Sequence, residues 1–265
     1  GEFWSAGGIS ARNIARWNGS NWSPLTGGLS MVAPQDQAAG LCVTVHNGAL
    51  YVGGWFQVAG ATSASNVARW DGASWSALGS GINGGAWCMT SFGSELAVGG
   101  QFDHAGGQST GAIARWNGAT WSAYGNTQFS QCASLLPYAG LLMAGTGGFQ
   151  MNNLYAWNGV SWNLPGGGLS NLAIALAIYN GELIAGGPFE FAGSTLVNRI
   201  PRWNGSAWNP LAVPPPVVTA FASLGSKLIV AGALTQSTTT EAPANNIMAW
   251  DGARKEPVQA GVNSI

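Results

Sequence analysis

One motif recurs along the whole chain at an almost constant interval. It reads Ala-Arg-Trp-Asp-Gly-Ala-Ser-Trp at residues 68 to 75, and close variants are found before and after this copy. The first tryptophans of the six copies are Trp17, Trp70, Trp116, Trp157, Trp203 and Trp250, which lie 53, 46, 41, 46 and 47 residues apart. A period in the forties in strand-like sequence is typical of a radial array of small sheets.

Each repeat contains four predicted strands. In the unit from 172 to 211, an apolar run from Leu172 to Tyr179 is followed by an Asn-Gly turn and by a second strand that carries Gly186-Gly187. A hairpin with the two motif tryptophans completes the unit. The chain contains five such units and the second half of another at its start. We therefore expect a single all-β domain over residues 1–265, a β-propeller of antiparallel four-stranded blades, six in number.

The repeated side chains have a structural interpretation. An Asp-Gly or Asn-Gly pair between two apolar runs favours a tight hairpin turn. Large flat side chains at a fixed period are expected to pack between successive sheets. The motif arginines should lie along a blade surface, with their heads bonded to carbonyls or a carboxylate. These predicted structural residues are Arg16, Trp17, Arg69, Trp70, Arg115, Trp116, Trp157, Arg202, Trp203 and Trp250.

The order of these elements resembles that of a known repeat. An apolar strand, a turn, Leu-x-Val-Gly-Gly, a variable loop and Arg-Trp-Asn/Asp-Gly-x-x-Trp together resemble a kelch-type propeller blade. The repeat is also similar to the Trp-Asn-Gly-x-x-Trp repeats of secreted bacterial surface proteins and of a fungal cell-polarity surface protein. The resemblance covers essentially the whole chain. It implies a propeller and says little about activity, because one fold serves many functions.

Composition excludes several partners. Nine basic and ten acidic residues leave a formal net charge of −1, so nothing suits nucleic acid, which requires a basic stripe. No apolar run approaches the length of a membrane span. The chain also begins without the basic and apolar segments of a secretion signal.

Groups that could carry chemistry are scarce. His46 and His104 occupy different positions in their repeats, and His104 next to Asp103 reads as a solvated loop pair. Cys42, Cys88 and Cys132 match no zinc pattern. Because equivalent positions on neighbouring blades are usually too far apart for a disulfide, we expect three buried thiols. The sequence predicts no enzyme activity, no metal and no cofactor.

Three tryptophans lie outside the motif. Trp87 begins an inner strand and is expected in the core, whereas Trp4 and Trp55 flank the variable loop. An exposed aromatic ring on a nearly uncharged surface suits an uncharged polysaccharide. Trp4 and Trp55 are therefore the candidate ligand-stacking residues, with ordinary packing as the alternative.

These observations favour a non-catalytic, secreted or cell-surface propeller that serves as a binding, adhesion or structural scaffold, with a lectin-like propeller as the alternative. The expected partner is a protein or a polysaccharide at the cell surface. Residue 1 falls in the middle of a repeat, which predicts a portion of a longer extracellular protein. Glu256 to Ile265, an upstream segment or a neighbouring copy could complete that blade, the last by strand exchange in a homo-oligomer.

Overall fold

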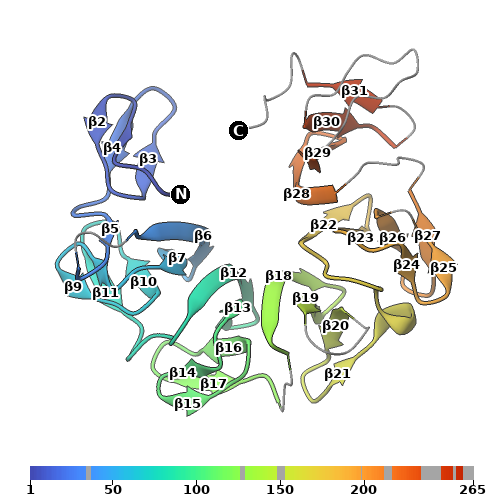
Figure 1. Cartoon of the computed structure of the whole chain (residues 1–265), viewed down its shortest axis with the longest axis horizontal. Helices are drawn as coiled ribbons and strands as arrows, with labels where there is room; N and C mark the ends of the chain where they lie inside the picture. Colours follow the sequence, from blue (N-terminus) through green and yellow to red (C-terminus); the bar gives the residue numbers. More distant parts are fainter. Residues whose placement is uncertain are drawn as a thin grey trace. The chain divides into compact units, whose positions relative to one another are not determined.

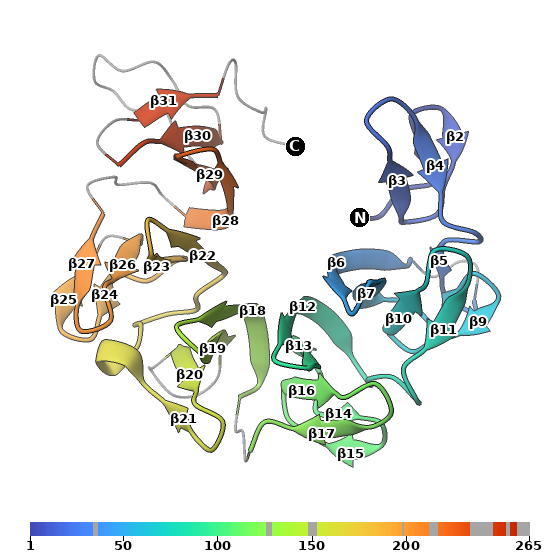
Figure 2. The ribbon, with the colours of Figure 1, turned by 180° about the vertical axis from the view of Figure 1, so that it is seen from behind.

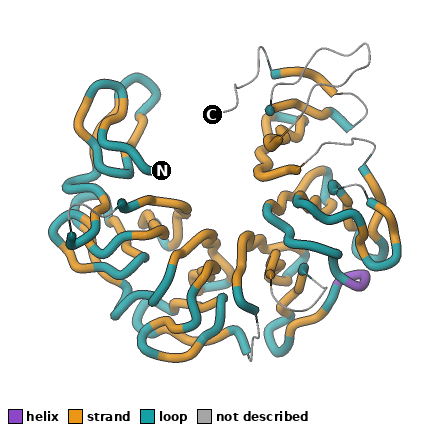
Figure 3. The backbone as a smooth tube through the Cα atoms, viewed as in Figure 1, coloured by secondary structure: helices purple, strands orange, loops and turns teal. Residues whose placement is uncertain are grey.

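The computed structural model describes the chain outside residues 34–36, 126–128, 148–152, 198, 212–216, 234–245, 253–254 and 259–265. The backbone divides into two compact units, Gly1–Pro137 and Tyr138–Ile265. Strands and connecting loops make up both units (Figure 3), and the helix of the described part is a single 3-10 turn, η1 (Pro165–Gly167).

The building block of the first unit is a four-stranded antiparallel sheet (Figure 1). Two such sheets are present. The first has the order β6-β7-β10-β11 and comprises β6 (Ala39–His46), β7 (Ala49–Trp55), β10 (Val67–Trp70) and β11 (Trp75–Ala77). The second has the order β12-β13-β16-β17 and comprises β12 (Gly85–Phe92), β13 (Glu95–Gln101), β16 (Ile113–Trp116) and β17 (Trp121–Ala123).

This unit also contains shorter strands. The first are the hairpin of β1 (Ser5–Ala6) and β2 (Ile9–Ser10), followed by the pair β3 (Ala15–Trp17) and β4 (Trp22–Pro24). The remaining short strands are β5 (Leu29–Ser30), β8 (Val58–Ala59), β9 (Thr62–Ser63), β14 (His104–Ala105) and β15 (Gln108–Ser109).

The same sheet order continues through Tyr138–Ile265 (Figure 2). The first sheet begins with β18 (Gln131–Tyr138), of which all but Tyr138 belongs to the first unit, and continues with β19 (Leu141–Gly147), β20 (Leu154–Trp157) and β21 (Trp162–Asn163). The second comprises β22 (Ala175–Tyr179), β23 (Glu182–Gly186), β26 (Pro201–Trp203) and β27 (Trp208–Pro210), with the hairpin β24 (Phe191–Ala192) and β25 (Thr195–Leu196) between its strands. The third comprises β28 (Val217–Leu224), β29 (Lys227–Ala233), β30 (Ile247–Trp250) and β31 (Lys255–Pro257).

The predicted four-stranded, antiparallel repeat is therefore confirmed, because the described residues form five such sheets, together with the pair β3–β4 and four smaller sheets of short strands. The number of blades and the single domain stay predictions. Glu256 to Ile265 was one of the segments expected to complete the first blade. Instead, Glu256 belongs to β31 (Lys255–Pro257), which pairs with β30 in the last sheet. Residues 259–265 of that segment lie outside the described part.

The motif hairpin owes its shape to a side-chain cap. Trp70 pairs with Trp75 across a loop in which Gly72 has a φ of 107°, a left-handed conformation that favours glycine. The Asp71 carboxylate accepts the backbone N–H groups of Ala73 and Ser74 at 2.9 and 2.8 Å. These backbone bonds lower the pKa of Asp71 to about 2, because they favour the ionised form. Asn18, Asn117, Asn158 and Asn204 cap four other motif hairpins in the same way.

The two glycines of the Gly-Gly pair in the second strand are each required for a different steric reason. A Cβ on Gly100 would lie 2.0 Å from the Gly85 carbonyl oxygen, where the register of β12 shifts between Ala86 and Cys88. Gly54, Gly187 and Gly232 meet a carbonyl oxygen equally closely, and Thr146 of β19 is the exception to this pattern. A Cβ on Gly53 would instead meet Met89 and Ala86 of the next sheet.

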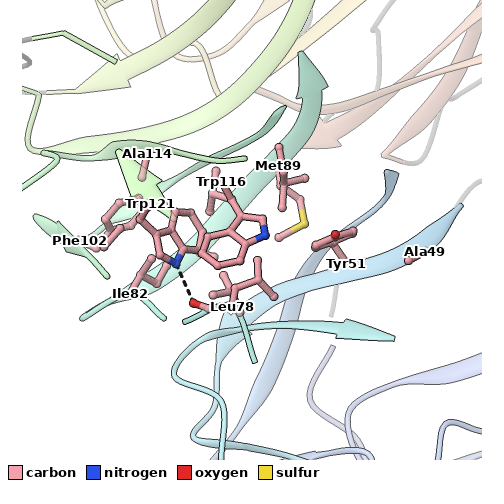
Figure 4. Packing of buried hydrophobic residues seen from close by; sticks show 14 residues of the cluster. Ala49, Tyr51, Leu78, Ile82, Met89, Phe102, Ala114, Trp116 and Trp121 are labelled. Carbon is pink, nitrogen blue, oxygen red and sulfur yellow. Dashed lines mark hydrogen bonds between the residues drawn. The ribbon is translucent and has the colours of Figure 1, made fainter. Parts of the chain in front are cut away.

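The core lies between successive sheets. Between the two sheets of the first unit, Tyr51 and Met89 pack with Trp116, Trp121 and other buried residues (Figure 4). The Trp121 indole Nε1–H donates to the Leu78 carbonyl at 2.7 Å. Trp75 and Trp208 donate to Thr26 and Pro165 in the same way, both at 3.0 Å. The second motif tryptophan thus bonds its own sheet to the segment that leads into that sheet from the previous one.

A repeated asparagine makes a further link that the motif analysis overlooked. The Asn66 side chain accepts the Phe56 backbone N–H and donates to the Ile82 carbonyl at 3.0 Å. Asn13 makes the equivalent bonds to Phe3 and Leu29. Its signal was available, because an asparagine stands four residues before the first motif tryptophan at residues 13, 66, 153 and 246. This side chain ties one blade to the segment that leads into the next.

Candidate functional site

Trp4 is the most exposed tryptophan of the described part, with 69% of its surface accessible. It precedes the hairpin β1–β2, and its carbonyl accepts the Ala11 N–H at 2.9 Å. This bond brings Arg12 alongside, and the guanidinium carbon lies 5.1 Å from the ring centroid of Trp4. The result is an exposed aromatic face next to a cation with five hydrogen-bond donors.

Trp55 is half exposed, with 42% of its surface accessible at the end of β7. A Cβ on Gly85 would lie 2.6 Å from its ring, so one part of the indole rests on the backbone of β12. Trp87, which we expected in the core, is only partly buried and stands at the register shift of β12. That prediction is corrected, because the bulge turns this residue out of the alternating pattern.

The motif tryptophans differ in exposure. Trp116, Trp157 and Trp250 are buried, and Trp70 and Trp203 are partly buried. Trp17 and its partner Trp22, whose rings lie 5.3 Å apart, are 49% and 42% exposed. Next to Trp22, a hollow of about 330 Å³ is lined by Ile14, Leu41, Cys42, Val43 and Val52, among others.

A second, open depression lies on the sheet β12-β13-β16-β17. It has a volume of about 600 Å³ and is lined by Trp116 and Trp121 together with small polar side chains such as Gln108, Ser109 and Thr120. Both tryptophans are less than 8% exposed, so this surface offers polar groups and little aromatic area.

His46 belongs to a chain of hydrogen bonds with a defined direction. The Asn47 side-chain nitrogen lies 3.0 Å from His46 Nε2 and must donate to it. A neutral His46 then carries its proton on Nδ1 and donates to Ser91 Oγ at 2.9 Å. Ser91 Oγ is an acceptor from His46 and donates to the Val45 carbonyl at 3.4 Å. A base that activates a serine must accept its proton, so this arrangement positions side chains and does not prepare a nucleophile.

Asp103 and His104 form an exposed pair, as the sequence predicted. The His104 Nδ1 lies 2.7 Å from the Asp103 carboxylate, which also accepts the Asn83 side-chain N–H at 2.7 Å. The hydrogen bond from His104, followed by that from Asn83, lowers the pKa of Asp103.

Two motif arginines have the carboxylate contact that we expected. Arg115 lies 3.4 Å from Glu95 and donates to Ser122 Oγ at 3.0 Å, and Arg202 lies 3.3 Å from Glu182. Ala49 occupies the position equivalent to Glu95 and Glu182 on the strand that pairs with Arg69. Exposed pairs of this kind contribute little, about 0 to 1 kcal/mol each.

The three cysteines are free thiols, but their surroundings differ from our expectation. Only Cys132 is fully buried, whereas Cys42 and Cys88 are partly exposed. The sulfur atoms of Cys88 and Cys132 lie 3.8 Å apart. Burial raises the pKa of Cys42 to about 12. Within the described residues, no group of three His, Cys, Asp or Glu side chains could hold a metal ion.

No protein-family model and no curated protein sequence matches this chain. Solved structures do. The computationally designed Ika8 protein superposes with a TM-score of 0.55 at 14% identity, over 86% of this chain and 65% of its own. The WD40 β-propeller domain of Doa1 matches at 0.50 and 10% identity, over 79% and 67%. An extracellular domain of BT4673 from B. thetaiotaomicron matches at 0.55 and 9% identity, over 88% and 32%.

These similarities concern the fold alone, since the identities are low. With the repeated antiparallel four-stranded sheets, they define the chain as an all-β protein of the β-propeller class. The chain spans about a third of the length of the BT4673 domain and about two thirds of the other two. None of the helices in the described part is long and apolar enough to cross a membrane.

Proposed function

We propose that this chain is a non-catalytic, extracellular or cell-surface propeller that binds a partner through exposed aromatic side chains. The observation that carries the proposal is Trp4, which presents most of its indole to solvent with Arg12 beside it. Large exposed apolar rings on a monomeric surface mark interaction sites when they gather with polar groups. The similarity to extracellular domains and to surface proteins with Trp-Asn-Gly-x-x-Trp repeats supports the location.

The titratable groups support a binding role over a catalytic one. Arg115 and Arg202 contact carboxylates along their strands, and His46 donates to Ser91 instead of activating it. Asp103 and His104, the first residue of β14, are exposed and bond to each other. Catalysis requires an acid or base aimed at a shared reacting atom, and these groups do not converge.

The alternative is a lectin-like propeller, and Trp4 also supports this function. An indole face packs against the C–H face of a sugar ring, and Arg12 could donate hydrogen bonds to its hydroxyl groups. Trp55 is the second candidate contact. Adhesion and structural scaffolding remain the broader proposal, with a protein or polysaccharide as the partner.

A glycan array followed by titration separates these functions. If the propeller is a lectin, we expect binding to an uncharged oligosaccharide that Trp4→Ala weakens about tenfold, because aromatic contacts contribute about 1 kcal/mol or more. Arg12→Ala should weaken it too. The control is Val160→Ala, which removes an exposed apolar side chain at 84% exposure in the other unit. An array without any binder contradicts the lectin, and binding unaffected by Trp4→Ala contradicts the site.

A second candidate function, self-association, is favoured by the edge of β3. In the neighbouring sheets, the third strand pairs on both sides, as β10 does with β7 and β11. Among the described residues β3 pairs with β4 alone. Val43 and Val45 of β6 are 61% and 68% exposed, whereas Met89, which takes the place of Val43 in β12, is 8% exposed. An unpaired edge beside exposed valines favours strand addition from a second copy.

Light scattering after size-exclusion chromatography tests this function. We expect a concentration-dependent dimer or larger assembly. The double variant Val43→Lys, Val45→Lys should shift it to monomer, because two lysines on β6 place charge where the strands of the second copy would pack. Val160→Lys adds a charge at an exposed site elsewhere and should leave the assembly unchanged. A monomer at the highest concentration reached rules out strand exchange.

A further inference from the structure

Two thiols in successive sheets, both within Gly1–Pro137, lie in contact. Cys88 of β12 and Cys132 of β18 have their Sγ atoms 3.8 Å apart, and the Cys88 Sγ also lies 3.6 Å from the Cys132 carbonyl oxygen. Both sulfurs occupy the space beside Gly99, where a Cβ would lie 2.7 Å from Cys132 Sγ and 2.8 Å from Cys88 Sγ. The missing side chain at Gly99 is what lets the two thiols approach.

The site equivalent to Cys88 in the preceding repeat is occupied by Cys42, and it serves as a comparison. Cys42 Sγ lies 3.6 Å from the Ala86 carbonyl, in the same relation as Cys88 to Cys132. A Cβ on Gly53 would lie 2.7 Å from Ala86 Cβ and 2.8 Å from Cys42 Sγ, as Gly99 does for its pair. Ala86 therefore stands where Cys132 stands in the next repeat. The two sites share a backbone arrangement, and only the second has two sulfurs.

We propose that Cys88 and Cys132 form a disulfide that links two successive blades when a small-molecule disulfide such as oxidised glutathione is present. The Cys88 thiolate attacks one sulfur of oxidised glutathione, which forms a mixed disulfide and releases one glutathione thiolate. The Cys132 thiolate then attacks Cys88 Sγ and releases the second. Two cysteine thiols are oxidised, one glutathione disulfide is reduced, and the two thiol protons pass to the two glutathione thiolates.

The geometry requires only local movement. The sulfurs begin at van der Waals contact and must approach to about 2.05 Å, which rotation of the two side chains can provide. Cys88 is the less buried residue of the two and meets the oxidant first, whereas Cys132 is buried and reacts with its neighbour. Burial raises the pKa of the Cys88 thiol, so little thiolate is present near neutral pH and the reaction should take hours.

The test uses the folded chain of 265 residues with oxidised glutathione, then alkylation of the remaining thiols and mass spectrometry of a digest. We expect the free thiol count to fall from three to one, with a Cys88–Cys132 linked peptide. Cys88→Ser and Cys132→Ser should abolish the link. Cys42→Ser is the matched control and should retain it, since Ala86 faces Cys42 in place of a second thiol.

A thermal melt gives a second measurement. The link closes a loop between residues 44 positions apart, which restricts the unfolded chain, and we expect the Tm of the oxidised protein to rise by about 5 to 10 °C. Addition of a reducing agent should reverse the shift. Three free thiols after long incubation, glutathione retained on Cys88 without a link, a link that includes Cys42, or a link between two chains would each overturn the proposal.

Discussion

Replacing Trp121 with alanine is expected to lower the free energy of unfolding by about 3 to 5 kcal/mol, as removal of a buried tryptophan usually does. The indole is 6% exposed and packs in the cluster between the two sheets of the first unit. The change leaves a large cavity there and deprives the Leu78 carbonyl of its 2.7 Å hydrogen bond. Urea denaturation followed by tryptophan fluorescence or circular dichroism measures the loss.

Two further variants separate the causes. Trp121→Phe keeps most of the apolar surface but removes the Nε1–H, so we expect an intermediate loss of about 1 to 3 kcal/mol from the Leu78 carbonyl. Trp22→Ala changes the equivalent motif position where the ring is 42% exposed, and its loss should be clearly smaller than that of Trp121→Ala. Equal losses for Trp22 and Trp121 would show that burial between sheets is not the cause.

Replacing Gly100 with alanine should cost about 3 kcal/mol or more, at the upper end of what overpacking usually costs. The added Cβ would lie 2.0 Å from the Gly85 carbonyl oxygen and 3.1 Å from Ala86 Cα, both backbone atoms that cannot rotate away. The strand pair β12–β13 would have to separate at its bulge. Denaturant midpoints of the variant and the parent chain give the difference.

Gly93→Ala is the control for this prediction. Gly93 has a φ of 60°, and a Cβ there would meet nothing within 4 Å, so the change tests backbone conformation without a clash. We expect a loss of about 1 to 2 kcal/mol from the left-handed conformation alone. If Gly100→Ala is no worse than Gly93→Ala, the close approach at the bulge does not explain the Gly-Gly pair.

Local pattern was sufficient to predict the repeated fold. The Asp71-Gly72 turn, the two strands around it and the Leu-x-Val-Gly-Gly strand are all coded by neighbours in the chain. Each repeat has four strands because it contains two hairpins: one turn joins the first two strands, and the Asp-Gly or Asn-Gly turn of the motif joins the last two. The exposed positions of Trp4 and Trp55 also agree with their place beside a variable loop. Their role as ligand contacts stays a prediction.

The neighbour of each side chain in the next sheet could not be predicted in the same way. Trp17 and Trp116 have the same motif, yet one is 49% exposed and the other 7%. Cys42 and Cys88 hold equivalent positions, yet only Cys88 faces a second thiol. Arg12 comes beside Trp4 through the hairpin β1–β2, which no motif indicates.

By itself, the sequence determined that this protein is built from four-stranded repeats with tryptophan hairpins, because strand alternation and turn chemistry act between residues close in the chain. The tertiary structure alone decided which tryptophans reach solvent, which carbonyl each repeated asparagine bonds, and which thiols meet. The thiol and tryptophan contacts join residues about forty positions apart, and the asparagine contacts join residues 16 positions apart. They depend on how two sheet faces pack together, and a period in the sequence does not encode that distance.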